Sequence, residues 1–478
     1  MADQPIASRV FTMADQGLFA ALSGDRNPMH MNALEARRTQ AGAPVVHGVH
    51  AVLWSLEALS GAGIPLKRLV SVKVRFERFI FLDREVTLRI VRQDEASLKF
   101  EVVDDGLQLL SVTLRFGERS EADAPTMARN VSPTEGAAPA VPPFEAMGEL
   151  SGRLISPSGD DAFQALFPAL SAALDARRIS GMAQLSTLVG MVCPGLHSIF
   201  SGFSVRLVAG DGAPGLTFRT LKADERFRMV TMAFNAWGTQ GDILAFARRE
   251  PVAPPGMDSL VKRVGPSEFA HVSALIVGGS RGLGAAAAKL IAAGGGRVTI
   301  SYARGQSEAE KLQREIAEAR GTEACRVIQL DVNAASAKAL AALAQPFNQL
   351  YYFATPQIFR QKSEVFSASV YDEFSRLYVD AFHDLVQVLR SMTDAPLAVF
   401  YPSSVAVTER PRGLTEYAMA KAAGEILCSD LERSDAGLRV IVARIPRTTT
   451  DQTSTIMPVE SADPVDVLLP LVRGMSAR

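Results

Sequence analysis

The chain has 478 residues, which is enough for two to four domains at about 100–200 residues each. Its 50 Lys and Arg nearly balance 51 Asp and Glu, so the global charge argues against a strongly basic nucleic-acid-binding protein. A hydrophobic content of 47% is too high for a disordered chain.

Three cysteines lie far apart without a CxxC pair, which argues against a disulfide framework or a zinc cluster and fits a reducing compartment. The sequence has no secretory signal pattern and no apolar run long enough to cross a bilayer. We therefore expect a soluble cytoplasmic protein that does not associate with a membrane.

Two proline-rich segments divide the chain. Residues 118–150 hold five prolines and little apolar periodicity, and a second group of breakers occupies 251–268. Both segments are predicted to be linkers. The domains then cover residues 1–117, 151–250 and 269–478.

The first two domains share a pattern. Each has an apolar stretch long enough for a helix, at 47–59 and 181–192, followed by four strand-like runs. One helix and about four antiparallel strands, occurring twice, predict a duplicated α+β unit. The expected strands are 70–80, 85–94, 96–106 and 108–117, then 198–207, 215–221, 226–234 and 242–249.

The third domain alternates short apolar runs with helical stretches, which predicts an α/β doubly wound parallel sheet of the Rossmann type. The expected strands are 274–279, 297–301, 326–332, 350–354, 397–404 and 438–445.

The first site motif is SGDRNPMH, where Asp25, Asn27, Pro28 and His30 lie in one tight stretch. Asp and Asn before a proline favour a turn. A carboxylate and an imidazole held close together could share one water, with one group taking a proton and the other returning one. The alternative is a plain loop turn with a capped surface histidine.

A second motif supports the functional interpretation. Gly48 lies where the apolar helix begins, so its N–H could stabilise a thioester oxygen that gains charge. The strings GDRNPMH (24–30) and GAPVVHG (42–48) resemble the MaoC-like, (R)-specific enoyl-CoA hydratases, a family of hot-dog folds. The resemblance implies that Asp25 and His30 are catalytic, that Gly48 forms the oxyanion hole, and that no metal is needed.

The second repeat lacks this chemistry. Its SGDD (158–161) echoes the first loop, but no Asn-Pro-x-His follows, and no His-Gly pair begins its helix. We expect a non-catalytic hot-dog partner that helps shape an acyl tunnel. The expected fold is thus an α+β double hot dog followed by the α/β domain.

The third domain opens with a glycine loop. The string LIVGGSRGLGAAAAKLI (275–291) places Gly278, Gly282 and Gly284 between a strand and a helix. Glycines let the backbone turn sharply and approach a pyrophosphate at the helix N-terminus. A glycine loop without a ligand is the plain alternative.

A second group in this domain suits ketone reduction. Tyr417 and Lys421 share one helix face, and Ser404 ends a strand thirteen residues before Tyr417. Tyr417 could donate a proton to the oxygen, Lys421 could stabilise the phenolate, and Ser404 could hydrogen-bond the carbonyl. A Tyr-x-x-x-Lys pair alone more often marks a surface helix.

Together these motifs resemble the short-chain dehydrogenase/reductases over residues 272–446, and are similar to the 3-oxoacyl thioester reductases. No acidic residue follows the second strand to bind the ribose of NAD, whereas Arg281 and Arg304 could meet a 2′-phosphate, so NADPH is predicted. The resemblance implies a cofactor site made of Gly278, Ser280, Arg281, Gly282, Leu283, Gly284, Ser301, Arg304, Asp331, Val332, Ala354, Tyr417, Lys421 and Pro446.

The domain departs from the family pattern in several places. The string 352–355 replaces Asn-Asn-Ala-Gly, and Pro446-Arg447 replaces Pro-Gly. Asp380 stands where the catalytic tetrad has an asparagine, and it could hold the same water or pair with Lys421. Because the domain is short, an abbreviated substrate lid is expected.

The two motif sets predict a bifunctional NADPH-dependent 3-oxoacyl thioester reductase and (R)-3-hydroxyacyl thioester dehydratase, acting on CoA or carrier-protein thioesters. One alternative is hydration followed by dehydrogenation, as in β-oxidation. Another is a hydratase with a non-catalytic NADP-binding scaffold.

Two expectations concern partners. Lys73, Arg75 and Arg78 alternate along a strand and could meet CoA phosphates or an acidic carrier protein, although a solvated strand face is the plainer interpretation. The oligomeric state is open, and a homodimer is considered because reductases of this family commonly pair through long helices.

Overall fold

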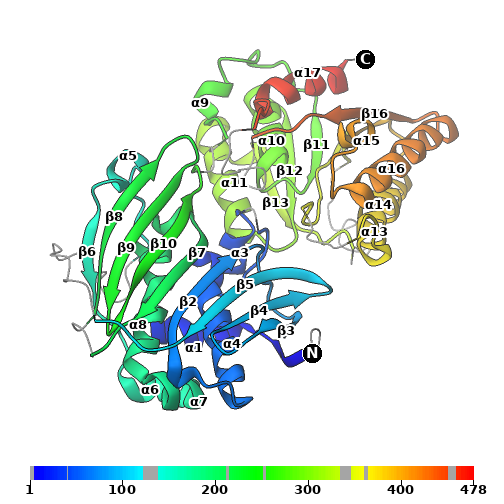
Figure 1. Cartoon of the computed structure of the whole chain (residues 1–478). Coiled ribbons are helices and arrows are strands. Elements are labelled where there is room, and N and C mark those ends of the chain that lie inside the picture. The colour runs from blue at the N-terminus through cyan, green and yellow to red at the C-terminus, as the bar shows by residue number, and fades with distance from the viewer. Residues whose placement is uncertain are drawn as a thin grey trace. The chain divides into compact units, whose positions relative to one another are not determined.

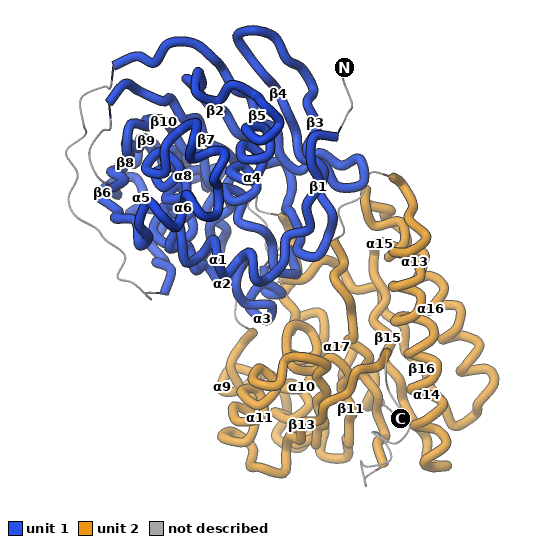
Figure 2. Tube along the Cα trace, turned by 90° about the horizontal axis from the view of Figure 1, so that it is seen from below, with its two compact units in different colours: residues 1–250, 454–458 blue, residues 251–453, 459–478 orange. Residues whose placement is uncertain are grey.

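A computed structural model of the chain describes residues 5–39, 41–121, 138–210, 215–250, 254–333, 346–359, 364–449 and 459–477. The chain divides into two compact units, one built from residues 1–250 and one mainly from residues 251–478 (Figure 2). Each unit is described by itself. None of the described helices is both long enough and apolar enough to cross a membrane.

The first unit is built on one antiparallel sheet of ten strands (Figure 1). The strand order is β1-β3-β4-β5-β2 in one half and β7-β10-β9-β8-β6 in the other, so the second half repeats the first in reverse order. The halves meet where β2 pairs with β7, with Val74 opposite Phe203. The strands are β1 (Pro5–Val10), β2 (Leu69–Phe76), β3 (Glu85–Gln93), β4 (Ser97–Asp104), β5 (Leu107–Phe116), β6 (Ser151–Leu154), β7 (Ser198–Leu207), β8 (Leu216–Asp224), β9 (Met229–Ala236) and β10 (Thr239–Ala247).

Each half packs one long helix on the sheet. The first is α4 (Gly48–Gly61), and the second is α8 (Ala176–Thr187), which continues as a π-helical turn at Leu188–Val192. Apolar residues of both helices share a core with the inward residues of the sheet. The other helices of this unit are α1 (Met13–Ser23), α2 (Pro28–Met31), α3 (Ala33–Ala36), α5 (Phe144–Met147), α6 (Asp160–Leu166) and α7 (Pro168–Leu174).

Alternation along β2 explains its mixed sequence. Val72 and Val74 are buried, while Lys73 and Arg75 between them are exposed, because successive side chains point to opposite faces of a sheet. The basic residues therefore lie on the outer face of the sheet. The expected strands are present, and β1 and β6 are additional edge strands that the sequence pattern did not indicate.

The second unit has six parallel strands in the order β13-β12-β11-β14-β15-β16. Ile276 faces one apolar cluster and Leu275 faces another, so the sheet is covered on both faces, as a doubly wound sheet requires. The strands are β11 (Ser273–Val277), β12 (Arg297–Tyr302), β13 (Cys325–Gln329), β14 (Gln349–Tyr352), β15 (Leu397–Ser404) and β16 (Leu438–Ile445). The helices are α9 (Met257–Leu260), α10 (Gly282–Ala293), α11 (Gln306–Arg320), α13 (Ala368–Ser375), α14 (Ala381–Ser391), α15 (Ala406–Glu409), α16 (Thr415–Ser434) and α17 (Pro464–Ser476).

Parts of both predicted linkers belong to the cores. Phe144 and Met147 of α5 are buried in the first unit, and Met257 and Leu260 of α9 are buried in the second. In each case two apolar residues three positions apart on one helical turn give the segment an apolar side. Residues 122–137 and 251–253 of these linkers lie outside the described residues.

The packing of α5 gives a stability prediction. Phe144→Ala removes a ring that is 5% exposed and carries the Arg228 guanidinium 4.5 Å above it, so we expect a loss of about 3–5 kcal/mol of unfolding free energy. Urea unfolding followed by tryptophan fluorescence measures this, because Trp54 and Trp237 both lie in the first unit. Val141→Ala, at a neighbouring residue that is 47% exposed, is the control and should change little. If the two substitutions lowered the unfolding free energy equally, the segment that contains Phe144 would be only a linker.

Two candidate active sites

The first site begins where α1 ends. Gly24 adopts φ 88°, a left-handed conformation that glycine reaches without strain, and the chain then turns into Asp25. Asn27 caps α2 by accepting the Met29 N–H at 3.1 Å. His30 is thereby held on a short helix close to Asp25.

The carboxyl group of Asp25 is buried between the two halves of the sheet unit. Its Oδ1 accepts the Asn27 N–H at 3.1 Å, and its Oδ2 accepts the Ser186 hydroxyl at 2.6 Å. Gly190 lies against the same carboxylate, and a Cβ there would fall 2.5 Å from Oδ1. Burial raises the pKa of Asp25, and the His30 ring and the two hydrogen bonds offset part of that rise.

His30 has a defined tautomer. Its Nδ1 lies 2.8 Å from the Val45 carbonyl oxygen, which can only accept, so Nδ1 carries a proton and Nε2 of the neutral ring is the acceptor. One possible ligand atom from each of Asp25, His30 and His47 lies within 4.8 Å of the other two. Because one hydrogen bond spans about 2.8 Å, Asp25 and His30 can share a single water.

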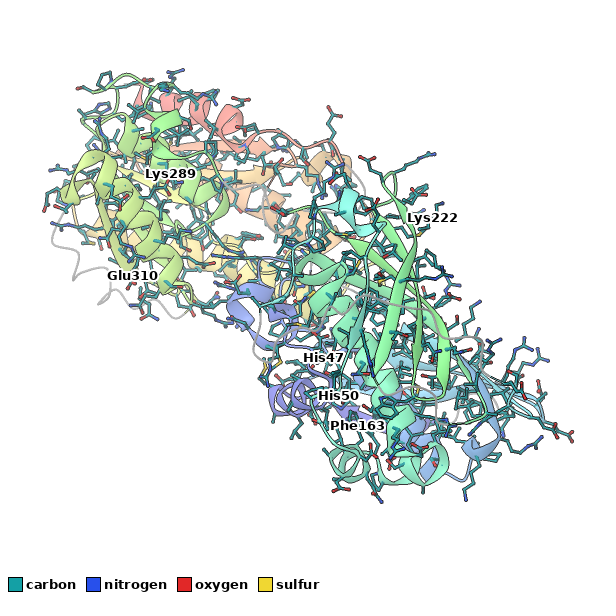
Figure 3. All side chains as sticks on the ribbon, turned by 90° about the vertical axis from the view of Figure 1, so that its left-hand side faces the viewer. His47, His50, Phe163, Lys222, Lys289 and Glu310 are labelled. Atoms are coloured by element: carbon teal, nitrogen blue, oxygen red, sulfur yellow. The ribbon has the colours of Figure 1, made fainter. Side chains whose placement is uncertain are left out.

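His47 completes this cluster and lies beside His50 in Figure 3. Its ring stacks on His30 with centroids 4.0 Å apart, while Nδ1 lies 2.6 Å from Gln16 Oε1 and Nε2 lies 3.0 Å from the Asp25 carbonyl oxygen. Burial, with His30 and His50 nearby, lowers the pKa of His47 well below its usual value. Because a neutral ring carries a single N–H, only one of these two oxygens can accept a hydrogen bond from it.

Gly48 is the first residue of α4. Within the described part of the chain its N–H has no hydrogen-bond partner, as expected for the first turn of a helix. A Cβ at this position would lie 2.7 Å from the Phe76 ring, so a side chain is excluded. An unpaired N–H at the positive end of a helix can bind an oxygen that gains negative charge.

The second half of the sheet unit contributes directly to this site, which sequence reasoning missed. Ser186 lies in α8 and Gly190 in the π-helical turn, where the Gly190 carbonyl accepts the Asn27 side-chain amide at 2.9 Å. Ser186 is 161 positions from Asp25, so no local motif could reveal the pair. The string SGDD (158–161) lies at the start of α6, whereas Asp25 follows the end of α1, so the two loops are not equivalent.

The glycine loop of the second unit joins β11 to α10. Gly278 and Gly282 have φ of 73° and 55°, and a Cβ on Gly284 would lie 2.4 Å from the Gly278 carbonyl oxygen. Ser301 anchors the loop by accepting the Gly278 N–H at 3.2 Å through its hydroxyl. Around Gly282, by contrast, no atom of the described residues beyond its own chain neighbours and helix backbone lies within 4 Å of a Cβ position, so the backbone is open to a phosphate group.

The other residues expected to bind the cofactor follow the carboxyl ends of the parallel strands or begin α10, which is where ligands bind in such sheets. Arg304, Asp331 and Pro446 are exposed. The half-buried members are Ser280, Arg281, Leu283, Val332 and Ala354.

The structure brings Ser404, Tyr417 and Lys421 together. Ser404 ends β15. Burial raises the pKa of Tyr417, and the Ser404 hydroxyl offsets part of that rise. The Lys421 ammonium donates to the Pro402 carbonyl at 2.7 Å. Burial lowers the pKa of Lys421 to about 7.

Asp380 does not join this group. It is exposed, whereas Lys421 is 4% exposed, and no ion pair joins these two described residues, so the pairing considered as one alternative is not formed. Residues Arg376–Asp380 form a π-helical turn, which rotates the side chains relative to an α-helix. The turn presents Tyr378 instead, and Lys421 Nζ lies 3.7 Å from the centre of its ring.

The unusual string 352–355 holds this turn in place. The Tyr352 hydroxyl donates to the Leu377 carbonyl at 2.8 Å, and the Thr355 and Tyr378 hydroxyls lie 2.6 Å apart. Tyr352 and Thr355 thus hold the turn that brings Tyr378 next to Lys421.

Comparisons with known proteins match each unit separately. The MaoC like domain family matches residues 3–111, and the short chain dehydrogenase family matches residues 272–462. A dehydrogenase/reductase from Sinorhizobium meliloti 1021 is 22% identical, with 46% of this chain and 92% of that chain covered and a TM-score of 0.38. A short-chain dehydrogenase from Escherichia coli CFT073, complexed with NADPH, is 20% identical, with 44% and 92% covered and a TM-score of 0.39. No curated protein matches the chain.

The first match contains Asp25, His30 and Gly48 and ends before the half that supplies Ser186. The second contains the glycine loop and Lys421. The chain is therefore a fusion of a MaoC-like domain with a short-chain dehydrogenase domain.

Proposed function

We propose that the chain reduces a 3-oxoacyl thioester with NADPH and dehydrates the resulting (R)-3-hydroxyacyl thioester. The observation that carries the proposal is the presence in one chain of an Asp25–His30 pair spaced for one water and a Ser404–Tyr417–Lys421 group. The product of the reduction is the substrate of the dehydration when the hydroxyl configuration matches. The thioester would be carried by CoA or by an acyl carrier protein.

The buried acid–base pair supports the hydratase chemistry. In the hydration direction, His30 Nε2 takes a proton from the shared water, the water oxygen bonds to C3 of the enoyl thioester, and the Asp25 carboxyl returns a proton to C2. The raised pKa of Asp25 suits a group that must carry that proton. Dehydration uses the same groups in reverse. The Gly48 N–H stabilises the thioester oxygen as it gains charge.

The second unit supports the reductase step. Bound NADPH would supply a hydride to the 3-oxo carbon. Tyr417 donates its hydroxyl proton to the substrate oxygen, and Ser404 orients that oxygen and the phenol. Lys421 stabilises the resulting phenolate through its positive charge. The open backbone at Gly282 and the tight contact at Gly284 suit a dinucleotide pyrophosphate.

A mass-spectrometric assay of acetoacetyl-CoA with NADPH tests the proposal. Wild type should yield crotonyl-CoA, Asp25→Asn should accumulate 3-hydroxybutyryl-CoA, and Tyr417→Phe should lower NADPH oxidation by about 100-fold or more. Tyr417→Phe should still hydrate crotonyl-CoA, which controls for folding. Unchanged activity in Tyr417→Phe would instead support a non-catalytic scaffold, and rapid oxidation of 3-hydroxybutyryl-CoA with NAD would support the β-oxidation direction.

The hydrogen bond from Ser186 to Asp25 predicts a pH effect. The hydroxyl stabilises the carboxylate, so Ser186→Ala should raise the pKa of Asp25 further. Because hydration needs protonated Asp25, the fall in crotonyl-CoA hydration at high pH should move to higher pH, with a rate loss of about 10-fold. Ser180→Ala is the matched control, because that buried hydroxyl in the same helix bonds Ser156. If the pH profile of crotonyl-CoA hydration is the same in Ser186→Ala as in wild type, Ser186 does not act on Asp25.

The cofactor preference is tested at Arg304. Arg304→Asp removes a positive charge expected near the 2′-phosphate and offers a carboxylate to a ribose hydroxyl, so NADPH affinity should fall about 10-fold or more and NADH affinity should rise. Fluorescence titration measures both dissociation constants. Arg314→Asp on the exposed surface of α11 controls for net charge. A wild type that binds NADH more tightly than NADPH would contradict the assignment.

A further inference from the structure

Lys421 occupies an aromatic cage. Its Nζ lies 3.7 Å from the ring centre of Tyr378, 5.0 Å from that of Tyr401 and 6.0 Å from that of Tyr417. The one hydrogen bond described for Nζ goes to the Pro402 carbonyl. The ammonium is therefore surrounded mainly by the faces of tyrosine rings.

No carboxylate of the described residues forms an ion pair with Lys421. The titratable groups that face it are Tyr378 from the π-helical turn, Tyr401 from β15, and Tyr417 and Cys428 from its own helix. Glu425, one turn along α16, is engaged elsewhere: it accepts the Ser403 hydroxyl and pairs with Arg444. A buried ammonium without a counterion favours its neutral form unless another group stabilises the charge.

The nearest ring can provide that stabilisation. The face of an aromatic ring carries negative electrostatic potential, and a cation within about 6 Å of the centroid is attracted to it, most strongly when water is excluded. Tyr378 is fully buried and is the closest of the three rings.

We propose that Tyr378 is a positioning residue of the reductase, whose ring face holds the Lys421 ammonium beside Tyr417. This inference rests on the proposed reductase function and adds a residue to it. Within the π-helical turn, Tyr378 is the residue that faces Lys421, whereas Asp380 is exposed.

The ring itself is held from three sides. Phe374 stacks on it with an interplanar angle of 5°, Tyr417 meets it edge-on at 75°, and its hydroxyl bonds Thr355. The hydroxyl therefore points to Thr355, while the ring face is the part that meets Lys421. Removing the Tyr378 hydroxyl and removing its ring should therefore have different effects on the proton affinity of Lys421.

Nuclear magnetic resonance of the full chain tests this without substrate or cofactor. The sequence has ten lysines, so lysine labelled with ¹³C at Cε gives few signals, and Lys421→Arg identifies the one of interest. Titration in wild type should show Lys421 losing its proton near pH 7. In Tyr378→Phe the proton affinity of Lys421 should stay within about twofold of the wild-type value, and in Tyr378→Leu it should fall about 10-fold.

Two further variants separate the ring's charge distribution from its bulk. Incorporating trifluorophenylalanine at position 378 keeps the size of the Tyr378→Phe ring but weakens its negative face, so the proton affinity should fall below that of Tyr378→Phe. Phe374→Leu opens space behind the ring without touching Lys421 and should leave the affinity near wild type. Equal proton affinity with the fluorinated and unfluorinated rings would overturn the proposal.

A kinetic measurement links the cage to the reaction. The fall of NADPH oxidation at high pH should move to lower pH in Tyr378→Leu and stay in place in Tyr378→Phe. A wild type that shows the expected titration but no NADPH oxidation would refute the proposed function alone. Active enzyme with the same titration in Tyr378→Leu as in wild type would refute the role of Tyr378 alone.

Discussion

Burying the Asp25 carboxyl group between the two halves of the first unit is the constraint on which its site depends. A carboxylate removed from water must be matched by hydrogen bonds, and here the partners are the Asn27 N–H and the Ser186 hydroxyl. Gly190 must lack a side chain because a Cβ would overlap the carboxylate. The half without the catalytic motif therefore still shapes the acid, and the β2–β7 pairing joins the two contributions in one sheet.

In the second unit the buried ionisable group is a cation, the Lys421 ammonium, instead of a carboxylate. Burial raises the pKa of Asp25 and lowers the pKa of Lys421 to about 7, so both groups move towards the range in which they can exchange protons near neutrality. The Lys421 ammonium is stabilised by the Pro402 carbonyl and by ring faces. Each site thus contains an ionisable group whose pKa is shifted mainly by burial.

Much of the fold could be predicted because it follows local rules. The alternation in β2 and the continuous apolar run of β11 reflect sheets covered on one or both faces. The edge strand β1 buries none of its side chains fully and β6 has only four residues, so neither shows a clear apolar pattern. Prolines precede α5, so its sequence resembles that of a linker. The burial of Phe144 could not be predicted from the sequence, because it depends on which distant residues pack against this proline-rich segment.

The sequence by itself determined the groups that lie close along the chain: Asp25 with His30, and Tyr417 with Lys421 one helical turn apart. Turn and helix geometry depends on neighbouring residues, so such groups can be recognised without a structure. Only the tertiary structure decided that Ser186 meets Asp25, because that contact depends on how two distant helices pack. It also decided that Tyr378 rather than Asp380 faces Lys421, because a π-helical turn adds a residue to the helical repeat and so changes which side chain points inward.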